Sequence, residues 1–157
     1  MKKINILLVD DHQLVLIGFK HVLLKFDLFE VVGSAKNGME AIDMCGKLPV
    51  EVVLMDVHLP IIDGFEATNQ IKQLFPSVKV IMLSTRIEDE YIVKADRAGA
   101  DGYLSKNIDK VELVEAITTV FKGEKYYSKE LSPEIIFNVR NKKYNQLKLD
   151  KTTLTPR

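Results

Sequence analysis

Short apolar runs and longer amphipathic stretches alternate five times along the chain. The apolar runs have the length of strands and are rich in β-branched residues, which favours β-structure. They cover residues 4–9, 30–34, 52–55, 78–83 and 102–104. The stretches between and after them repeat apolar residues at helical spacing and predict α-helices over residues 12–26, 39–48, 64–75, 89–98 and 110–122.

The predicted strands are almost wholly apolar and do not alternate with polar residues. This pattern indicates burial on both faces, which is typical of a parallel sheet covered by helices. Right-handed crossovers between successive strands then favour a doubly wound α/β sheet. We predict one five-stranded parallel sheet with helices on both faces.

Polar residues follow the ends of four predicted strands. Asp10 and Asp11 follow the first, Asp56 the third, Ser84 the fourth, and Lys106 lies just beyond the fifth. Ligands of doubly wound sheets bind outside the carboxyl ends of the strands, where the winding direction reverses. If the strand order is 2-1-3-4-5, the first and third strands are neighbours. Three carboxylates, a hydroxyl and an ammonium group are therefore expected to share one mouth.

Three adjacent carboxylates repel one another unless a cation or a proton lies among them. Mg²⁺ prefers oxygen ligands and often completes its shell with water and phosphate oxygens. Lys106 and Ser84 could then contact a phosphoryl group, and Asp56 could accept it as an aspartyl phosphate. Asp10 and Asp11 alone could equally cap a helix. Their grouping with the other three residues favours a phosphoryl-transfer site.

The chain has 157 residues, a size typical of one compact domain, and 28% charged residues exclude a mostly disordered chain. Its zero net charge is unevenly spread. Residues 1–123 hold 14 basic and 18 acidic groups, whereas residues 124–157 hold 8 basic and 4 acidic groups. Ser132 followed by Pro133 predicts a helix that reaches Gln146. Because this basic tail lacks a recognition-helix pattern, we expect a linker rather than a nucleic-acid-binding segment.

Cysteine use and the N-terminus bear on the compartment. Cys45 lies in a helical pattern and is expected to be a buried thiol, which fits a reducing cytosol. The first apolar run is too short for a signal peptide, and Asn5 interrupts it. No stretch approaches the roughly 20 apolar residues of a membrane span. We expect a cytoplasmic protein without a membrane partner.

Four ordered blocks resemble the receiver domain of two-component response regulators. They read VDDH at 9–12, LMDVHLPIIDG at 54–64, IMLST at 81–85 and AGADGYLSK at 98–106. The DDH opening, the AGADGYL block and the ending LTPR at 154–157 are similar to the group with a LuxR-type helix-turn-helix output domain. The resemblance implies a flavodoxin-like receiver over residues 1–123. It also implies a partly helical linker over 124–157, ending where the DNA-binding domain would start.

The resemblance also implies roles for individual residues. Asp56 would be the phosphoacceptor, and Mg²⁺ would be bound directly by Asp11, Asp56 and the backbone carbonyl of His58. Asp10 would act largely through water. In this sequence the four residues follow the first and third predicted strands.

Three further residues complete the implied switch. Lys106 and Ser84 would contact the phosphoryl group, and Tyr103 would change rotamer with the Ser84 hydroxyl, although Tyr103 could equally be a core aromatic. The phosphoryl donor would be a sensor histidine kinase, and transcription would be controlled through a DNA-binding domain absent from this chain. Such a protein is a signalling switch that catalyses its own phosphorylation, not a turnover enzyme.

Three alternatives have different sequence requirements. An aspartyl-phosphate phosphatase would need a second acid two residues after the nucleophile, where His58 stands. A nucleotide or flavin binder would need a glycine-rich loop after the first strand, where residues 10–13 read DDHQ. A receiver could also act as a phosphorylation-independent interaction module. The presence of Asp56, Ser84 and Lys106 favours the phosphorylated receiver over the last alternative.

The first predicted helix carries apolar residues on two sides. Val15, Phe19, Val22 and Phe26 form the predicted core-facing stripe. On the opposite side lie Ile17 and Leu24. Scattered exposed apolar residues are common, but these two are also a candidate surface for a kinase or for a homodimer.

Overall fold

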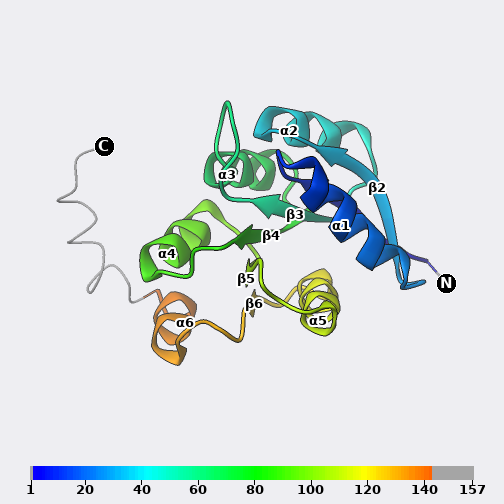
Figure 1. The fold of residues 1–157 in the computed structure, drawn as a ribbon. Helices are drawn as coiled ribbons and strands as arrows, with labels where there is room; N and C mark the ends of the chain where they lie inside the picture. Colours follow the sequence, from blue (N-terminus) through cyan, green and yellow to red (C-terminus); the bar gives the residue numbers. More distant parts are fainter. Residues whose placement is uncertain (1, 143–157) are drawn as a thin grey trace.

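A parallel six-stranded sheet in the order β2-β1-β3-β4-β5-β6 forms the centre of the computed structural model, which describes residues 2–142 (Figure 1). The strands are β1 (Ile4–Val9), β2 (Phe29–Ala35), β3 (Val52–Asp56), β4 (Lys79–Ser84), β5 (Gly102–Ser105) and β6 (Tyr126–Tyr127). The helices are α1 (Gln13–Leu24), α2 (Gly38–Lys47), α3 (Gly64–Leu74), α4 (Asp89–Ala98), α5 (Lys110–Phe121) and α6 (Pro133–Arg140). The predicted doubly wound sheet and its 2-1-3-4-5 order are confirmed.

Each face of the sheet has its own core. In β3, Val53 and Met55 belong to the core on the side of α2, α3 and α4. Val52 and Leu54 belong to the core on the side of α1 and α5. All four side chains are at most 1% exposed. The apolar strand pattern thus corresponds to burial on both faces, as predicted.

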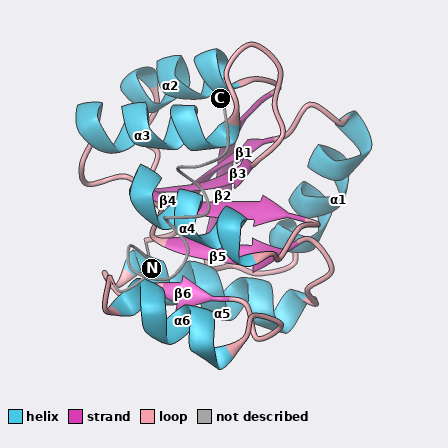
Figure 2. Ribbon diagram, turned by 90° about the vertical axis from the view of Figure 1, so that its left-hand side faces the viewer, coloured by secondary structure: helices cyan, strands magenta, loops and turns pink. Residues whose placement is uncertain are grey.

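A sixth strand was not predicted from the sequence. Tyr126 pairs with Gly102 and Tyr127 with Tyr103 in parallel register, so β6 continues the sheet beyond β5 (Figure 2). The two-residue strand has neither the length nor the β-branched composition of the other strands. Only its neighbour β5 defines it, which is why the sequence pattern did not reveal it.

The predicted core stripe of α1 is confirmed in part. Phe19, Val22 and Phe26 are half-buried and pack against the core on the side of α1 and α5. The stripe did not include Leu16 and Leu23, which are the buried side chains of this helix. The packed face of α1 is therefore broader than the predicted stripe.

The predicted C-terminal helix is present but shorter. Ser132 Oγ accepts a hydrogen bond from the backbone N–H of Ile135 at 3.1 Å and caps α6, as the sequence indicated. The helix ends at Arg140, not at Gln146, and Lys142 adopts a positive φ of 56°. Residues 143–157, including the LTPR ending, lie outside the described residues.

The sequence predicts a buried thiol at Cys45 and no membrane-spanning segment. Cys45 is buried, and burial raises the pKa of its thiol to about 11, so the thiol stays protonated at neutral pH. Among the described residues, no helix is both long and apolar enough to cross a membrane.

Candidate functional site

The carboxyl ends of β1 and β3 bring three aspartates together. Asp10 follows β1 and Asp56 ends β3, and these strands are neighbours in the sheet. Possible ligand atoms of Asp10, Asp11, His12 and Asp56 all lie within 4.8 Å of one another. Asp10 and Asp56 are each 3% exposed, whereas Asp11 is exposed. The structure therefore forms the acidic mouth that the strand order predicted.

Lys106 bridges two of these carboxylates. Its Nζ lies 2.8 Å from Asp10 Oδ2 and 3.0 Å from Asp56 Oδ1. Its backbone N–H donates to the carbonyl of Ser84 at 2.9 Å, which fixes the β5–α5 loop beside the end of β4. The ammonium group thus offsets part of the negative charge that burial makes costly.

Burial and pairing act in opposite directions on the two partners. Burial raises the pKa of Asp56, more than the hydrogen bond and charge of Lys106 lower it. For Lys106, burial alone would lower the pKa, but hydrogen bonds to Asp56 and Asp10 and the charges of both aspartates outweigh it and raise the pKa. The ammonium group therefore remains charged at neutral pH.

The donor set fits a hard divalent cation. Three carboxylates within reach of one point supply the oxygen ligands that Mg²⁺ prefers. His12, for which the sequence pattern gave no role in this site, has Nδ1 3.0 Å from Asp10 Oδ1 and 3.1 Å from Asp11 Oδ1. Because imidazole suits transition metals more than Mg²⁺, we interpret His12 as a hydrogen-bond partner of the carboxylates.

Gly64 allows α3 to start directly against Asp56. A Cβ at Gly64 would lie 2.2 Å from the backbone oxygen of Asp56, so no other residue fits without moving the strand end. Asp63 Oδ1 accepts the backbone N–H of Glu66 at 2.9 Å and caps the helix. The Asp63-Gly64 pair is thus structural and holds the end of β3 in place.

Ser84 and Tyr103 meet at the backbone of Arg86. Ser84 Oγ accepts the N–H of Arg86 at 2.9 Å, and the Tyr103 hydroxyl donates to the carbonyl of Arg86 at 2.8 Å. Both side chains are 1% exposed. Burial raises the pKa of Tyr103 to about 12 despite a hydrogen bond with the Ser84 side chain. Tyr103 is therefore a core aromatic and also a hydrogen-bond partner of the β4–α4 loop.

A ring cluster beside the mouth was not apparent from the sequence. The His58 ring lies edge-on to Tyr91 with centroids 6.1 Å apart, and the Arg86 guanidinium carbon is 5.0 Å from the Tyr91 ring centre. A backbone hydrogen bond from His58 lowers the pKa of Asp56, against the larger effect of burial. These residues come from three separate segments, so no local spacing relates them.

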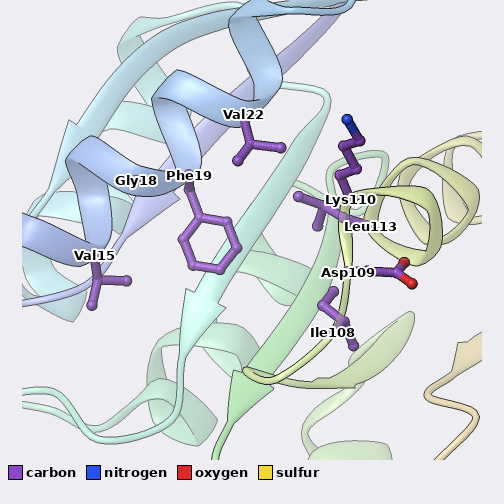
Figure 3. Close-up of a pocket in the computed structure, with 8 residues that line it drawn as sticks. All are labelled: Val15, Gly18, Phe19, Val22, Ile108, Asp109, Lys110 and Leu113. Carbon is purple, nitrogen blue, oxygen red and sulfur yellow. The ribbon is translucent and has the colours of Figure 1, made fainter.

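An apolar hollow beside α1 lies apart from Asp10, Asp11 and Asp56, none of which line it. It has a volume of about 310 Å³ and lies between α1 and the start of α5 (Figure 3). Phe19 and Val22 line it from α1, and Ile108 and Leu113 from the other side. Ile17 and Leu24 do not line it and are 53% and 66% exposed, as their predicted side of the helix implied.

Comparison with known families identifies the family of this chain. The family model described as "Response regulator receiver domain" matches residues 6–118, a range that contains Asp10, Asp56, Ser84 and Lys106. The chain belongs to the response regulator receiver family. Members of this family are signalling proteins rather than enzymes, so the predicted class is confirmed.

Individual relatives agree with this assignment. Response regulator UvrY of Escherichia coli is 41% identical over 132 residues, which are 84% of this chain and 61% of that protein. Response regulator GacA of Pseudomonas protegens is 39% identical over 134 residues, 85% of this chain and 63% of that protein. The chain thus spans about three fifths of the length of these relatives.

A solved structure extends the similarity to the fold. A two-component response regulator of the LuxR family from an Aurantimonas species superimposes with a TM-score of 0.78 at 30% identity, covering 90% of this chain and 99% of that one. The resemblance to receivers of the group with LuxR-type output domains is therefore confirmed.

Proposed function

We propose that this receiver accepts a phosphoryl group from a sensor histidine kinase onto Asp56 in a Mg²⁺-dependent reaction, and thereby switches a transcriptional output. The observation that carries the proposal is the position of Asp56. Its carboxylate lies at the end of the central strand, 3.0 Å from Lys106 Nζ and within the group that Asp10 and Asp11 complete.

Asp56 is the nucleophile in this proposal. A carboxylate oxygen of Asp56 forms a bond to phosphorus while the bond from phosphorus to the donor's imidazole nitrogen breaks and the imidazole leaves. Asp11, Asp56 and the backbone carbonyl of His58 would hold Mg²⁺, with Asp10 acting largely through water. The cation would offset the negative charge of the entering group.

The remaining roles fall to Lys106, Ser84 and Tyr103. Lys106 turns its ammonium group from Asp56 to a phosphoryl oxygen, a change that its neighbouring position permits. The Ser84 hydroxyl donates a hydrogen bond to another phosphoryl oxygen. The same hydroxyl oxygen still accepts the hydrogen bond from the N–H of Arg86. Tyr103 follows through their shared partner, the backbone of Arg86.

The wider partners follow from the relatives. A solved structure described as "Structure of two RcsB dimers bound to two parallel DNAs" matches this chain at 25% identity with a TM-score of 0.75. By analogy, we propose a homodimer that contacts DNA through an output domain. A cytoplasmic location follows from this role.

The direct test is phosphorylation by a small donor. The full chain is incubated with Mg²⁺ and acetyl phosphate, and its intact mass is recorded. We expect the gain of one phosphoryl group in the wild type and no gain in Asp56→Asn. Asp63→Asn is the matched control, because asparagine also caps helices and Asp63 lies outside the mouth, and it should be phosphorylated normally.

The opposite result has a definite meaning. If the wild type gains no mass while Mg²⁺ still binds, and cognate kinase also fails to modify it, the proposal is wrong. The chain would then be a phosphorylation-independent interaction module.

A further inference from the structure

Residues 126–142 fold back onto the receiver and are called the C-terminal latch here. Within the latch, β6 extends the sheet and α6 packs beside α4 (Figure 1). Leu131, Ile135 and Val139 are 5%, 1% and 1% exposed. They belong to the same buried cluster as Tyr103 and Ile92. The latch is therefore part of the core next to α4 and β5.

One polar contact fastens the C-terminal end of the latch to α4, and another joins the two ends of the latch to each other. Lys142 Nζ lies 2.6 Å from Asp96 Oδ2, and the Asp96 side chain, near the end of α4, is 2% exposed. The Arg140 guanidinium carbon lies 5.0 Å from the centre of the Tyr127 ring. The ion pair of Lys142 forms only while the latch is docked. Undocking would separate Lys142 from Asp96 and leave the buried carboxylate without its cation.

Tyr103 connects the latch to the acidic mouth through three hydrogen bonds. The backbone N–H of Ser128 donates to the carbonyl of Tyr103 at 2.8 Å. The hydroxyl of the same tyrosine donates to the carbonyl of Arg86 at 2.8 Å, and the N–H of Arg86 donates to Ser84 Oγ at 2.9 Å. A path of direct contacts thus runs from the latch to the hydroxyl of Ser84, the residue after Leu83, which pairs with Asp56 in the sheet.

One group in the latch opposes docking. Ser128 Oγ is fully buried and has no hydrogen-bond partner among the described residues. A buried hydroxyl without a partner disfavours the state that buries it. Docking is therefore a balance between apolar and ionic contacts on one side and this desolvated hydroxyl on the other.

We propose that the latch and the acidic mouth are coupled through Tyr103, so that a phosphoryl group on Asp56 tightens the docking of residues 126–142. This inference rests on the proposed function. A phosphoryl group that engages the Ser84 hydroxyl fixes Arg86, which in turn holds the Tyr103 hydroxyl. Tyr103 then stays in the buried cluster that it shares with Leu131 and Ile135. Residues 126–142 would thereby be more ordered when Asp56 is phosphorylated.

Reciprocity follows from this coupling. If occupancy of the mouth favours docking, docking must favour occupancy of the mouth by the same factor. Loss of the latch contacts would remove the packing of Tyr103 on one side and weaken its hold on Arg86. Phosphoryl binding would become weaker although no residue of the mouth had changed.

Hydrogen exchange of the full chain tests the coupling directly. Amide exchange of residues 126–140 is measured with Mg²⁺ alone and with Mg²⁺ plus beryllofluoride, which mimics a phosphoryl group on Asp56. We expect exchange to slow by about fivefold or more, the lower end of typical coupling between sites. Tyr103→Phe retains the ring but lacks the hydroxyl, and it should lose this response to beryllofluoride.

Latch variants test the reciprocal effect. Ile135→Ser should weaken beryllofluoride binding by about the same factor, and Phe137→Ser, on the exposed side of the same helix, should not. If Ile135→Ser fails to fold, Lys142→Met removes the ion pair to Asp96 without changing the apolar core and should act in the same direction.

The two proposals fail in different ways. Normal phosphorylation of the wild type with unchanged exchange of residues 126–140 would overturn the latch coupling and leave the function of Asp56 intact. Absence of phosphorylation would overturn the proposed function. In that case the coupling is judged by hydrogen exchange alone. Equal exchange rates of residues 126–140 with and without beryllofluoride would overturn the coupling, and slower exchange with beryllofluoride would support it.

Discussion

At the scale of single residues, Lys106 acts as an internal counter-ion of the mouth. Its ammonium group lies within 3.0 Å of both Asp10 and Asp56, and both carboxylates are buried. The sequence pattern assigned Lys106 to a phosphoryl group. The structure shows a contact with the carboxylates that would receive the phosphoryl group and the metal. The same lysine can therefore pair with these carboxylates before phosphorylation and with the phosphoryl group after it.

Lys106→Met should therefore destabilise the protein and make it depend more on Mg²⁺. Without Mg²⁺ we expect the free energy of unfolding to fall by about 3 kcal/mol, because two buried carboxylates lose their cation. Mg²⁺ should raise the Tm of the variant more than that of the wild type. The control Lys47→Met, which removes an exposed pair with Asp43, should change stability little. An equal Mg²⁺ response of variant and wild type would contradict the counter-ion role.

Tyr103 should make stability fall at high pH. Its pKa rises from 10 in the unfolded chain to about 12 in the fold because the ring is buried. The unfolded state therefore loses this proton first, and the stabilising contribution, complete below pH 10, declines between pH 10 and 12. The loss should reach about 1 kcal/mol at pH 11. Urea unfolding at pH 9 and pH 11 measures it, and Tyr103→Phe should show a smaller decline; an identical decline would refute the assignment.

At the scale of elements, α1 presents different residues to three surroundings. Leu16 and Leu23 face the core, and Val15, Phe19 and Val22 line the hollow toward α5. Ile17 and Leu24 remain exposed. We propose this outer face as a contact for a kinase or for a second copy of the chain, since these apolar side chains are not buried within this domain.

Ile17→Ser combined with Leu24→Ser should leave stability almost unchanged and impair association. We expect slower phosphotransfer from the kinase or weaker self-association, measured by transfer kinetics and by sedimentation. Leu74→Ser, at a residue of α3 that is 60% exposed, controls for the loss of an exposed leucine. Wild-type behaviour of the double variant in both assays would end the proposal.

At the scale of the whole molecule, the sheet extends past the receiver into the following segment. The family match ends at residue 118, yet β6 and α6 add a strand and a helix to the same cores. We propose that residues 1–123 form the receiver unit and residues 124–157 a linker. The structure shows the first part of this linker docked on α4 and β5.

A chain that ends at Gly123 should fold cooperatively but with lower stability. It keeps the five central strands and loses Leu131, Ile135 and Val139 from the core. Burial of each such side chain stabilises by about 1.5 to 3 kcal/mol, partly offset by the entropy of ordering the segment. We expect a net loss of about 2 kcal/mol in urea unfolding. Failure to fold would show that the unit extends beyond Gly123.

The sequence by itself determined the parallel sheet, and the resemblance of its four blocks to receivers supplied the strand order that groups the mouth. Uniformly apolar strands require burial on both faces, and the crossover rule leaves few topologies. Once the order is known, residues that follow neighbouring strands must meet, so Asp10, Asp56 and Lys106 were predictable from their places in the chain. Asp63 and Ser132 were likewise predictable as turn and cap residues, because those interactions span only three residues.

Only the tertiary structure decided the features that depend on contacts between distant segments. The pairing of Tyr126 and Tyr127 with β5, the ion pair of Lys142 with Asp96, and the meeting of Ser84 with Tyr103 at Arg86 join residues with no common periodicity. The width of the inward face of α1, which includes Leu16 and Leu23, also depended on what packs against it, since helical spacing alone does not set how wide a buried face is. Local pattern specifies what a segment can form, and the energy of packing selects its neighbours.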